Sequence, residues 1–281
     1  MSADLPAVVT TEWLALRLDE PDVRILDATW YLPTVRRDAR AEYLQAHIPG
    51  AVFFDIDAVK DATNPLPHML PDAATFAAAV GAMGIGDGDR VVVYGARGFI
   101  ASARVWWTFR VFGHDAVAVV DGGLPKWRAE GRPLEPRVPA PGPRTFTARF
   151  RPQLVRDLEA MRANVDRRRE QVVDARSEGR FVGTEPEPRP GLRSGHIPGS
   201  VSLPHDRLCR DDGTLADAAD LEGAFARAGV DLDRPVVTTC GSGVSAAVLA
   251  LALHVLGRRD VPVYDGSWSE WGGRQDTPVE R

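Results

Sequence analysis

Hydrophobic and polar positions along this chain follow two alternating patterns. Short β-branched runs predict buried strands, and segments whose apolar residues recur on one helical face predict amphipathic helices. We expect strands near residues 23–27, 91–94, 117–120, 172–174, 236–239 and 261–264. We expect helices near residues 75–83, 102–112, 154–169, 221–228 and 244–256. Strands that alternate with helices are typical of an α/β fold with a mostly parallel sheet covered by helices.

Three segments of the first half of the chain return in the second half. ILDA at 25–28 returns as VVDA at 172–175, AHIPGAV at 46–52 as GHIPGSV at 195–201, and DGG at 121–123 as DGS at 265–267. The offsets are 147, 149 and 144 residues, and a repeat of this length predicts two copies of one domain. Prolines crowd residues 133–152, so we place a linker at 136–152 between domains at 1–135 and 153–281.

The candidate nucleophile is Cys240, which ends the run VVTT at 236–239 and precedes the loop GSGVSA. In a strand-to-helix loop, backbone N–H groups and the helix N-terminus stabilise a thiolate. A lone cysteine after an apolar strand is also a common core residue. Gly241 and Gly243, which bracket Ser242, favour instead a loop wrapped around a small anion. We therefore predict that Cys240 is a nucleophile at the carboxyl end of its strand, where α/β folds bind ligands.

The first copy of the repeat lacks this sulfur. VVVYGARG at 91–98 aligns with VVTTCGSG at 236–243, which sets Gly95 at the position of Cys240. The first domain therefore keeps the scaffold, and we expect the chemistry in the second domain.

Composition excludes several classes of function. The 281 residues are 44% hydrophobic with a net charge of -5, which gives no broad basic surface for nucleic acid. No apolar run has membrane length and the first residues do not resemble a leader, so we expect a cytoplasmic protein without a membrane partner. Two cysteines, Cys209 and Cys240, are too few for a disulfide framework, and the histidines lack metal-ligand spacing. We expect no metal and no organic cofactor.

Four features of this chain resemble two-domain rhodanese-type sulfurtransferases. They are the tandem repeat, the His-Ile-Pro-Gly motif in each half, the loop CGSGVSA at 240–246 and the ending DGSWSEW at 265–271. The loop is similar to the Cys-Gly-Ser-Gly-Val-Thr-Ala of the 3-mercaptopyruvate-using members, with Ser245 in place of threonine. Thiosulfate-preferring members carry basic residues at the two positions after the cysteine, where this chain has Gly241 and Ser242. The resemblance implies two tandem rhodanese-like domains, and a substrate loop that includes Gly241, Gly243, Val244 and Ser245.

A second match is the segment GRFVGTEPEPR at 179–189. In the family it supplies two arginines nine residues apart that hold the carboxylate and keto oxygen of the substrate, and Arg180 and Arg189 match them. A guanidinium presents the fork of donors that a planar carboxylate requires. Because the chain is rich in arginine, Arg180 and Arg189 could alternatively be solvated surface residues. Binding residues concentrate in irregular segments, however, and this segment is Pro-rich and irregular, which favours a binding role.

The resemblance implies transfer of sulfur in two steps. The Cys240 thiolate attacks the sulfur of 3-mercaptopyruvate, pyruvate leaves, and a persulfide remains until a thiol or cyanide removes its outer sulfur. Ser242 could relay a proton, and by resemblance His47 with Asp38 could complete that relay. The occurrence of His47 and its counterpart His196 in both copies is equally consistent with shaping a turn before proline.

Other functions remain open at this point. A thiosulfate sulfurtransferase would use the same cysteine. A cysteine phosphatase or arsenate reductase would need an arginine six residues after the nucleophile, where this chain has Ala246. A sulfur carrier or redox sensor would show slow turnover with small donors. The sequence does not choose among thioredoxin, a small thiol and cyanide as the acceptor.

Overall fold

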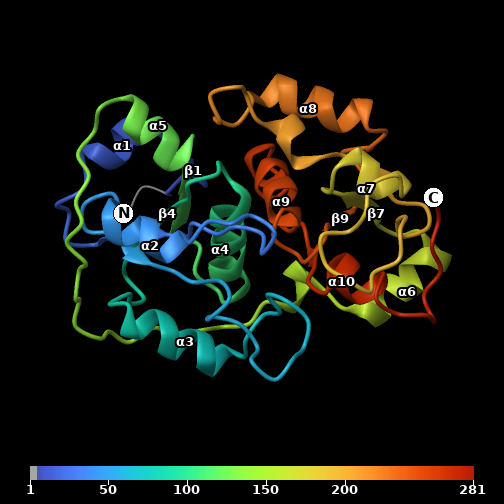
Figure 1. Cartoon of the computed structure of the whole chain (residues 1–281), viewed down its shortest axis with the longest axis horizontal. Coiled ribbons are helices and arrows are strands. Elements are labelled where there is room, and N and C mark those ends of the chain that lie inside the picture. Colours follow the sequence, from blue (N-terminus) through green and yellow to red (C-terminus); the bar gives the residue numbers. More distant parts are fainter. Residues whose placement is uncertain (1–4) are drawn as a thin grey trace. The chain divides into compact units, whose positions relative to one another are not determined.

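A computed structural model of the chain describes residues 5–281, which form two compact units. Unit 1 comprises the chain up to Ala62 together with Leu70–Arg151 and Asp211–Thr214. Unit 2 comprises Thr63–Met69, Pro152–Arg210 and Leu215–Arg281. Figure 1 draws most of unit 1 in blue to green and most of unit 2 in yellow to red. Each unit is described by itself below.

Unit 1 is built on a five-stranded parallel sheet. Its strands are β1 (Val8–Val9), β2 (Val23–Asp27), β3 (Val52–Phe53), β4 (Arg90–Tyr94) and β5 (Val117–Val120), in the order β1-β5-β4-β2-β3. Its helices are α1 (Thr11–Ala15), α2 (Ala39–Gln45), α3 (Ala73–Ala82), α4 (Ile100–Val111) and α5 (Gly123–Ala129). Helix α4 packs against β4 and β5, and stacked Phe76 and Phe112 join α3 to the end of α4.

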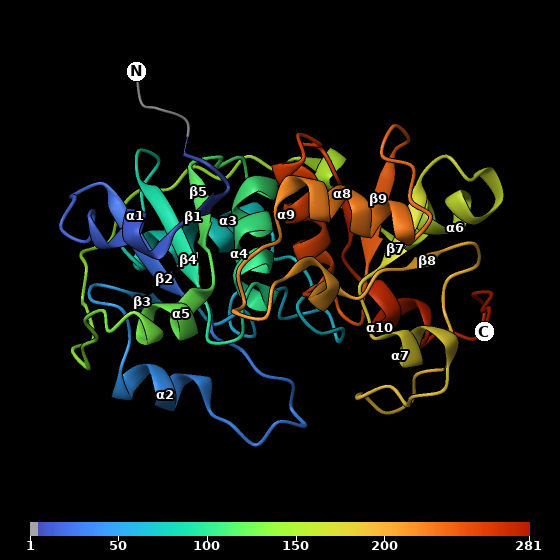
Figure 2. The ribbon, with the colours of Figure 1, turned by 90° about the horizontal axis from the view of Figure 1, so that it is seen from above.

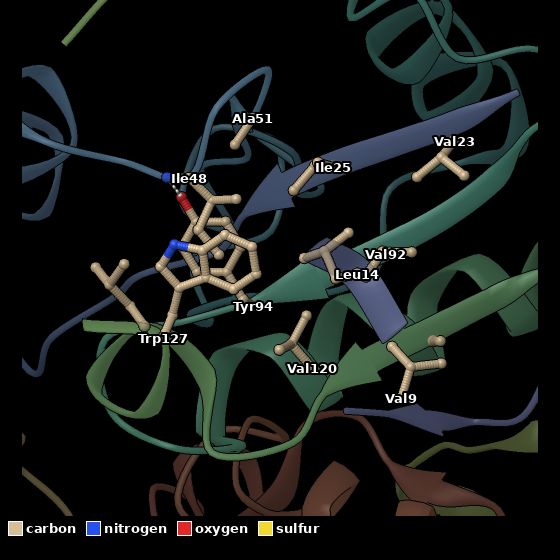
Figure 3. Packing of buried hydrophobic residues seen from close by; sticks show 12 residues of the cluster. Val9, Leu14, Val23, Ile25, Ile48, Ala51, Val92, Tyr94, Val120 and Trp127 are labelled. Atoms are coloured by element: carbon tan, nitrogen blue, oxygen red, sulfur yellow. Dashed lines mark hydrogen bonds between the residues drawn. The ribbon is translucent and has the colours of Figure 1, made fainter. Parts of the chain in front are cut away.

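The core of unit 1 follows the two-residue period of its strands. Side chains on one face of the sheet pack with Leu14 of α1 and Trp127 of α5 (Figure 3). The strand residues on this face alternate along the chain: Val23, Ile25, Val92, Tyr94, Ala118 and Val120. All of them are buried, which excludes water from the hydrophobic layer and supplies most of the driving force for folding.

Unit 2 repeats this architecture. Its strands are β6 (Val155–Arg156), β7 (Gln171–Asp174), β8 (Val201–Ser202), β9 (Val236–Thr239) and β10 (Val263–Tyr264), in the parallel order β6-β10-β9-β7-β8. Its helices are α6 (Leu158–Arg167), α7 (Glu178–Val182), α8 (Ala218–Arg227), α9 (Ala246–Val255) and α10 (Ser267–Trp271), with 3₁₀ turns η1 (Pro152–Leu154) and η2 (His205–Leu208). Helix α9, labelled with β9 in Figure 2, packs against β9 and also against β10.

The prediction of two tandem α/β domains, each a parallel sheet covered by helices, is confirmed. In both units the fifth, fourth and second strands of the unit lie between the two edge strands, in the same order. The structure adds four two-residue edge strands and five short helices that the hydrophobic pattern did not predict. These elements are too short for a period to be visible in the sequence.

Two predicted boundaries differ from the structure. The helix expected from residue 154 begins at Leu158, because the Asp157 side chain accepts from the Ala160 amide and caps it there. The Pro-rich segment that we placed as a linker is irregular, but its residues up to Arg151 belong to unit 1. Arg144 N–H donates to the Gly81 carbonyl, and Arg149 N–H donates to the Phe112 carbonyl. The compact units change at Arg151 and Pro152.

In the part of the chain that the structure describes, no helix combines the length and apolar character needed to cross a bilayer.

Candidate active site in the second unit

Cys240 directly follows the last residue of the central strand β9 and is 2% exposed. The chain then forms the loop Gly241–Ser245 before α9 begins at Ala246. Gly243 has a φ of +73°, a left-handed conformation that strains residues with a side chain. The strand end, the turn and the helix start therefore place Cys240 at the carboxyl edge of the sheet, as the sequence predicted.

Helix α10 fixes the backbone of this loop. The Ser267 hydroxyl accepts from the Cys240 N–H at 3.2 Å, and the Trp268 N–H donates to the Cys240 carbonyl at 2.9 Å. The N–H and the hydroxyl of Ser269 both donate to the Gly241 carbonyl, at 2.8 and 2.6 Å. In a trans peptide the N–H points opposite to the carbonyl, so the amides of Gly241 and Ser242 point away from α10.

Unit 1 holds Gly95 in the same way, which supports the alignment of Gly95 with Cys240. The Leu124 N–H donates to the Gly95 carbonyl at 3.0 Å, and Leu124 is the counterpart of Trp268 in the repeat. The loop scaffold is therefore common to both units, whereas the sulfur belongs to unit 2.

The Arg180 guanidinium lies directly against the loop. A Cβ built on Gly241 would come within 2.8 Å of Arg180 Nη2, so a side chain at position 241 would displace this group. Arg180 belongs to the short helix α7, whose N-cap Ser177 accepts from the Arg180 amide. We expected Arg180 in an irregular loop; it lies in a helix of five residues, too short for periodicity to predict.

A buried ion network holds Arg180 in place. The Glu187 carboxylate, 2% exposed, accepts from Arg180 Nη2 at 2.5 Å and from Arg176 Nη1 at 2.7 Å. Arg176 also donates to Asp174 at 2.7 Å and stacks on Trp268, with 4.4 Å between its guanidinium carbon and the ring centroid. Burial by itself would lower the pKa of Arg176, but the charges of Asp174 and Glu187 more than offset this and raise it. Arg176 therefore stays charged.

The second predicted arginine, Arg189, lies beside a histidine that sequence reasoning missed. Arg189 Nη2 is 3.2 Å from His68 Nε2, and both residues belong to unit 2. His68 is 4% exposed, and its φ of +61° is unusual for a residue other than glycine. A guanidinium can only donate, so His68 Nε2 accepts and its proton lies on Nδ1. This contact orients the Arg189 guanidinium.

His47 and Asp38, which we predicted as parts of a proton relay, both have structural contacts in unit 1. His47 is fully buried, with Nδ1 2.6 Å from the Tyr43 carbonyl and Nε2 3.1 Å from the Arg137 carbonyl. Asp38 caps α2 by accepting from the Ala41 amide. His196, the counterpart of His47, has the same arrangement, with Nδ1 2.9 Å from the Phe181 carbonyl and a stacked Phe181 ring. The turn-shaping interpretation therefore fits both histidines.

The other predicted residues lie in the loop itself. Ser242 and Val244 are 4% and 3% exposed, and Ser245 is half-buried at the start of α9. Ala246 is fully buried in α9, at the position where a cysteine phosphatase would need an arginine. Within residues 5–281, no three histidine, cysteine or acidic side chains are grouped as a metal site would require.

Sequence reasoning did not identify Arg176, Glu187 or the serines of α10 as parts of the site. A signal for them was available, because Arg176 follows the repeated Asp-Ala pair and the serines lie in the repeated ending. His68 had no such signal, since its segment lies in the first half of the chain and has no counterpart in the repeat that we identified.

The comparison with known proteins agrees with this geometry. The model of the rhodanese-like domain matches residues 10–130 and again residues 157–274. The chain belongs to the rhodanese family. It is 45% identical to a protein of Arabidopsis thaliana named thiosulfate/3-mercaptopyruvate sulfurtransferase 1, mitochondrial, over 97% of this chain and 78% of the relative. It is also 45% identical to the human 3-mercaptopyruvate sulfurtransferase, over 94% of this chain and 91% of the relative.

A solved structure of the family has the same fold. The crystal structure of SseA from Escherichia coli, described as a 3-mercaptopyruvate sulfotransferase, superimposes with a TM-score of 0.86 at 38% identity. The match covers 94% of this chain and 99% of SseA. The predicted resemblance to two-domain rhodanese-type sulfurtransferases is therefore confirmed.

Proposed function

We propose that unit 2 is a sulfurtransferase site that takes sulfur from 3-mercaptopyruvate onto Cys240 and passes it to a thiol acceptor or cyanide. The observation that carries this proposal is the Arg180 guanidinium, which lies against Gly241 next to the cysteine. A carboxylate bound by this guanidinium would bring the rest of a small α-keto acid to the Cys240 loop. The name of the human relative, which is 45% identical, supports the same donor.

In the first half-reaction, the Cys240 thiolate attacks the sulfur of 3-mercaptopyruvate. A sulfur–sulfur bond forms, the carbon–sulfur bond breaks, and its electron pair leaves with carbon as the enolate of pyruvate, which is then protonated. A persulfide remains on Cys240. In the second half-reaction, an acceptor thiolate or cyanide attacks the outer sulfur and restores the thiolate.

The loop and the arginines have distinct roles in these steps. The amides of Gly241 and Ser242 stabilise negative charge on the inner and outer sulfur, because α10 holds the carbonyls of Cys240 and Gly241 in the opposite direction. Arg180 and Arg189 bind the carboxylate and the keto oxygen of the donor. His68 orients Arg189, and the Ser242 hydroxyl is placed in the loop to supply a proton. His47 and Asp38 have no part in this scheme.

Thiosulfate is the second candidate donor, and the Arabidopsis relative carries both donors in its name. The neutral residues Gly241 and Ser242 favour mercaptopyruvate, because a dianion without a carboxylate gains more from basic side chains at these positions. For the acceptor we propose a low-molecular-weight thiol or thioredoxin. For the location we propose the cytoplasm, although the Arabidopsis relative is named as mitochondrial.

The test is a comparison of kcat/KM for sulfur transfer to cyanide from 3-mercaptopyruvate and from thiosulfate. We expect mercaptopyruvate to be preferred by tenfold or more, which corresponds to about 1.4 kcal/mol of differential transition-state binding. Arg180→Ala and Arg189→Ala should each reduce kcat/KM for mercaptopyruvate far more than for thiosulfate. The matched control is Arg207→Ala, an exposed arginine of η2 in the same unit. Equal losses with both donors would remove the argument for a carboxylate clamp.

A further inference from the structure

Unit 1 contains a cavity of about 290 Å³ at the carboxyl ends of β2 and β4. Its walls include Asp27, Thr29 and Ala96 from these strand ends, Glu42 from α2, and Leu124 and Arg128 from α5. Carboxyl ends of parallel strands are the usual ligand sites of α/β folds. The family resemblance and the proposed sulfur transfer assign no ligand to this cavity, because unit 1 has Gly95 in place of the nucleophile.

The repeat shows what occupies the corresponding position in unit 2. The Ala28 N–H donates to the Tyr94 carbonyl, and the Ala175 N–H donates to the Thr239 carbonyl, both at 2.8 Å. The residue that follows each of these alanines also has the same contact in both units. The Thr29 amide donates to Asp27 at 2.8 Å, and the Arg176 amide donates to Asp174 at 2.9 Å. Thr29 is therefore the structural counterpart of Arg176.

In unit 2 the Arg176 guanidinium is fully buried between four partners. It donates to Asp174 and Glu187, donates to the Gly195 carbonyl at 2.9 Å, and stacks on Trp268. Unit 1 keeps the counterpart carboxylate, Asp27, and the counterpart carbonyl of Ala46. It replaces the guanidinium by Thr29 and the indole by Leu124. Both replacements are smaller, and both side chains line the cavity.

Asp27 is thus left without the cation that its counterpart has. It is 1% exposed, its hydrogen-bond partners are the amide and hydroxyl of Thr29 and the hydroxyl of Tyr94, and the buried His47 ring is close enough to interact with its charge. Burial raises the pKa of this carboxyl above its usual value. Within residues 5–281, no arginine or lysine forms an ion pair with Asp27.

The two arginines at the cavity have other partners. Arg37 forms a two-pronged pair with Glu42, with both donor–acceptor distances at 2.7 Å. Arg128 donates to the Ala46 carbonyl, at 3.3 Å. Arg37 and Glu42 offset each other in charge, so Asp27 is the remaining anion of the cavity wall and Arg128 its remaining cation.

We propose that this cavity binds a small molecule that carries a guanidinium or amidinium group. The planar cation occupies the position that Arg176 takes in unit 2 and donates to Asp27. The rest of the molecule lies over Leu124, where unit 2 has the larger Trp268. An anionic group on the same molecule would pair with Arg128, so free arginine is a compound of the right chemical class.

The experiment titrates the full chain with methylguanidinium and follows binding by calorimetry and by the shift in Tm. Urea, which has the planar shape of the guanidinium group and no charge, is titrated in parallel. We expect saturable binding of methylguanidinium with a dissociation constant on the order of 1 mM or tighter, and none of urea. Asp27→Asn should weaken binding at least tenfold.

Thr29→Arg gives the cavity its own guanidinium. We expect it to abolish binding and to raise Tm, because the introduced guanidinium pairs with Asp27. Ala78→Arg, at an exposed position of α3, adds the same charge to unit 1 away from the cavity and should bind as the parent does. If Thr29→Arg does not fold, Asp27→Asn alone decides. Absence of saturable binding by the parent, equal binding of urea, or unchanged binding in Asp27→Asn would overturn the proposal.

Discussion

Replacement of Glu187 by glutamine tests whether the buried ion network positions Arg180. Glutamine keeps the shape of the side chain but removes the charge shared by Arg176 and Arg180, which now contact Glu187 at 2.7 and 2.5 Å. Loss of one partner of a buried ion pair costs about 3–5 kcal/mol. Arg176 keeps its bonds to Asp174, and Arg180 is 19% exposed and regains some hydration, so we expect the lower limit, about 3 kcal/mol.

This loss should be visible in stability and in kinetics. For a protein of this size, about 3 kcal/mol corresponds to a fall in Tm of about 6–12 °C. The KM for mercaptopyruvate should rise about tenfold, equivalent to about 1.4 kcal/mol, because Arg180 loses the carboxylate that holds it against Gly241. The assays are thermal unfolding and steady-state sulfur transfer, with both donors.

The matched control is Glu185→Gln, two residues away in the same loop. Glu185 accepts from the Ser177 hydroxyl at 2.7 Å and is exposed, so its replacement should change stability by less than about 0.5 kcal/mol. Equal Tm and equal KM for the two variants would refute the positioning role of Glu187.

Three further predictions concern the loop and the stability of unit 1. Gly241→Ala places a Cβ 2.8 Å from Arg180 Nη2 and should raise the KM for mercaptopyruvate about tenfold in steady-state assays while leaving Tm nearly unchanged; an unchanged KM would contradict the close approach. Ser267→Ala leaves the Cys240 amide without its hydroxyl acceptor. Chemical denaturation should therefore show a free energy of unfolding lower by about 1–3 kcal/mol, and kcat should fall. Wild-type values of both quantities would exclude this contact as a support of the loop. Burial lowers the pKa of His114 below its usual value near 6.5, so the folded protein binds fewer protons than the unfolded one and loses stability as pH falls below about 6.5. In denaturant titrations, His114→Gln should lose less stability between about pH 7.5 and about pH 5.5, and an identical loss would rule out His114 as the cause.

The hydrophobic pattern predicted the central strands well because they are buried on both faces. The bounds of β2, β5 and β9 match the expected residues. The edge strands were missed because two residues are too few to show a hydrophobic period. Helix α7 was missed because its five residues are also too few, and the capping serine before them is the only local signal for a helix. Both kinds of element depend on tertiary contacts rather than on local pattern.

The part of the candidate site that lies in repeated or family-like segments could be predicted from the sequence. The repeat and the family resemblance identified Cys240, its loop and Arg180, which the structure brings together at Gly241. They did not identify Glu187 or His68, whose places depend on how α7 and the segment Thr63–Met69 pack within unit 2. The relay through His47 stays a prediction from resemblance, because a histidine that shapes a turn and a histidine that moves protons look the same in sequence; the structure adds that both His47 ring nitrogens lie beside backbone carbonyls of unit 1.

The most direct test of the account is the mass of the protein after it reacts with 3-mercaptopyruvate in the absence of an acceptor. We predict a gain of one sulfur atom per chain, located by peptide mapping on Cys240, with release of one pyruvate. Cys209→Ser should react in the same way, and Cys240→Ser should gain no sulfur and release no pyruvate. Sulfur located on Cys209, or pyruvate released by Cys240→Ser, would contradict the assignment of Cys240 as the sulfur-carrying nucleophile.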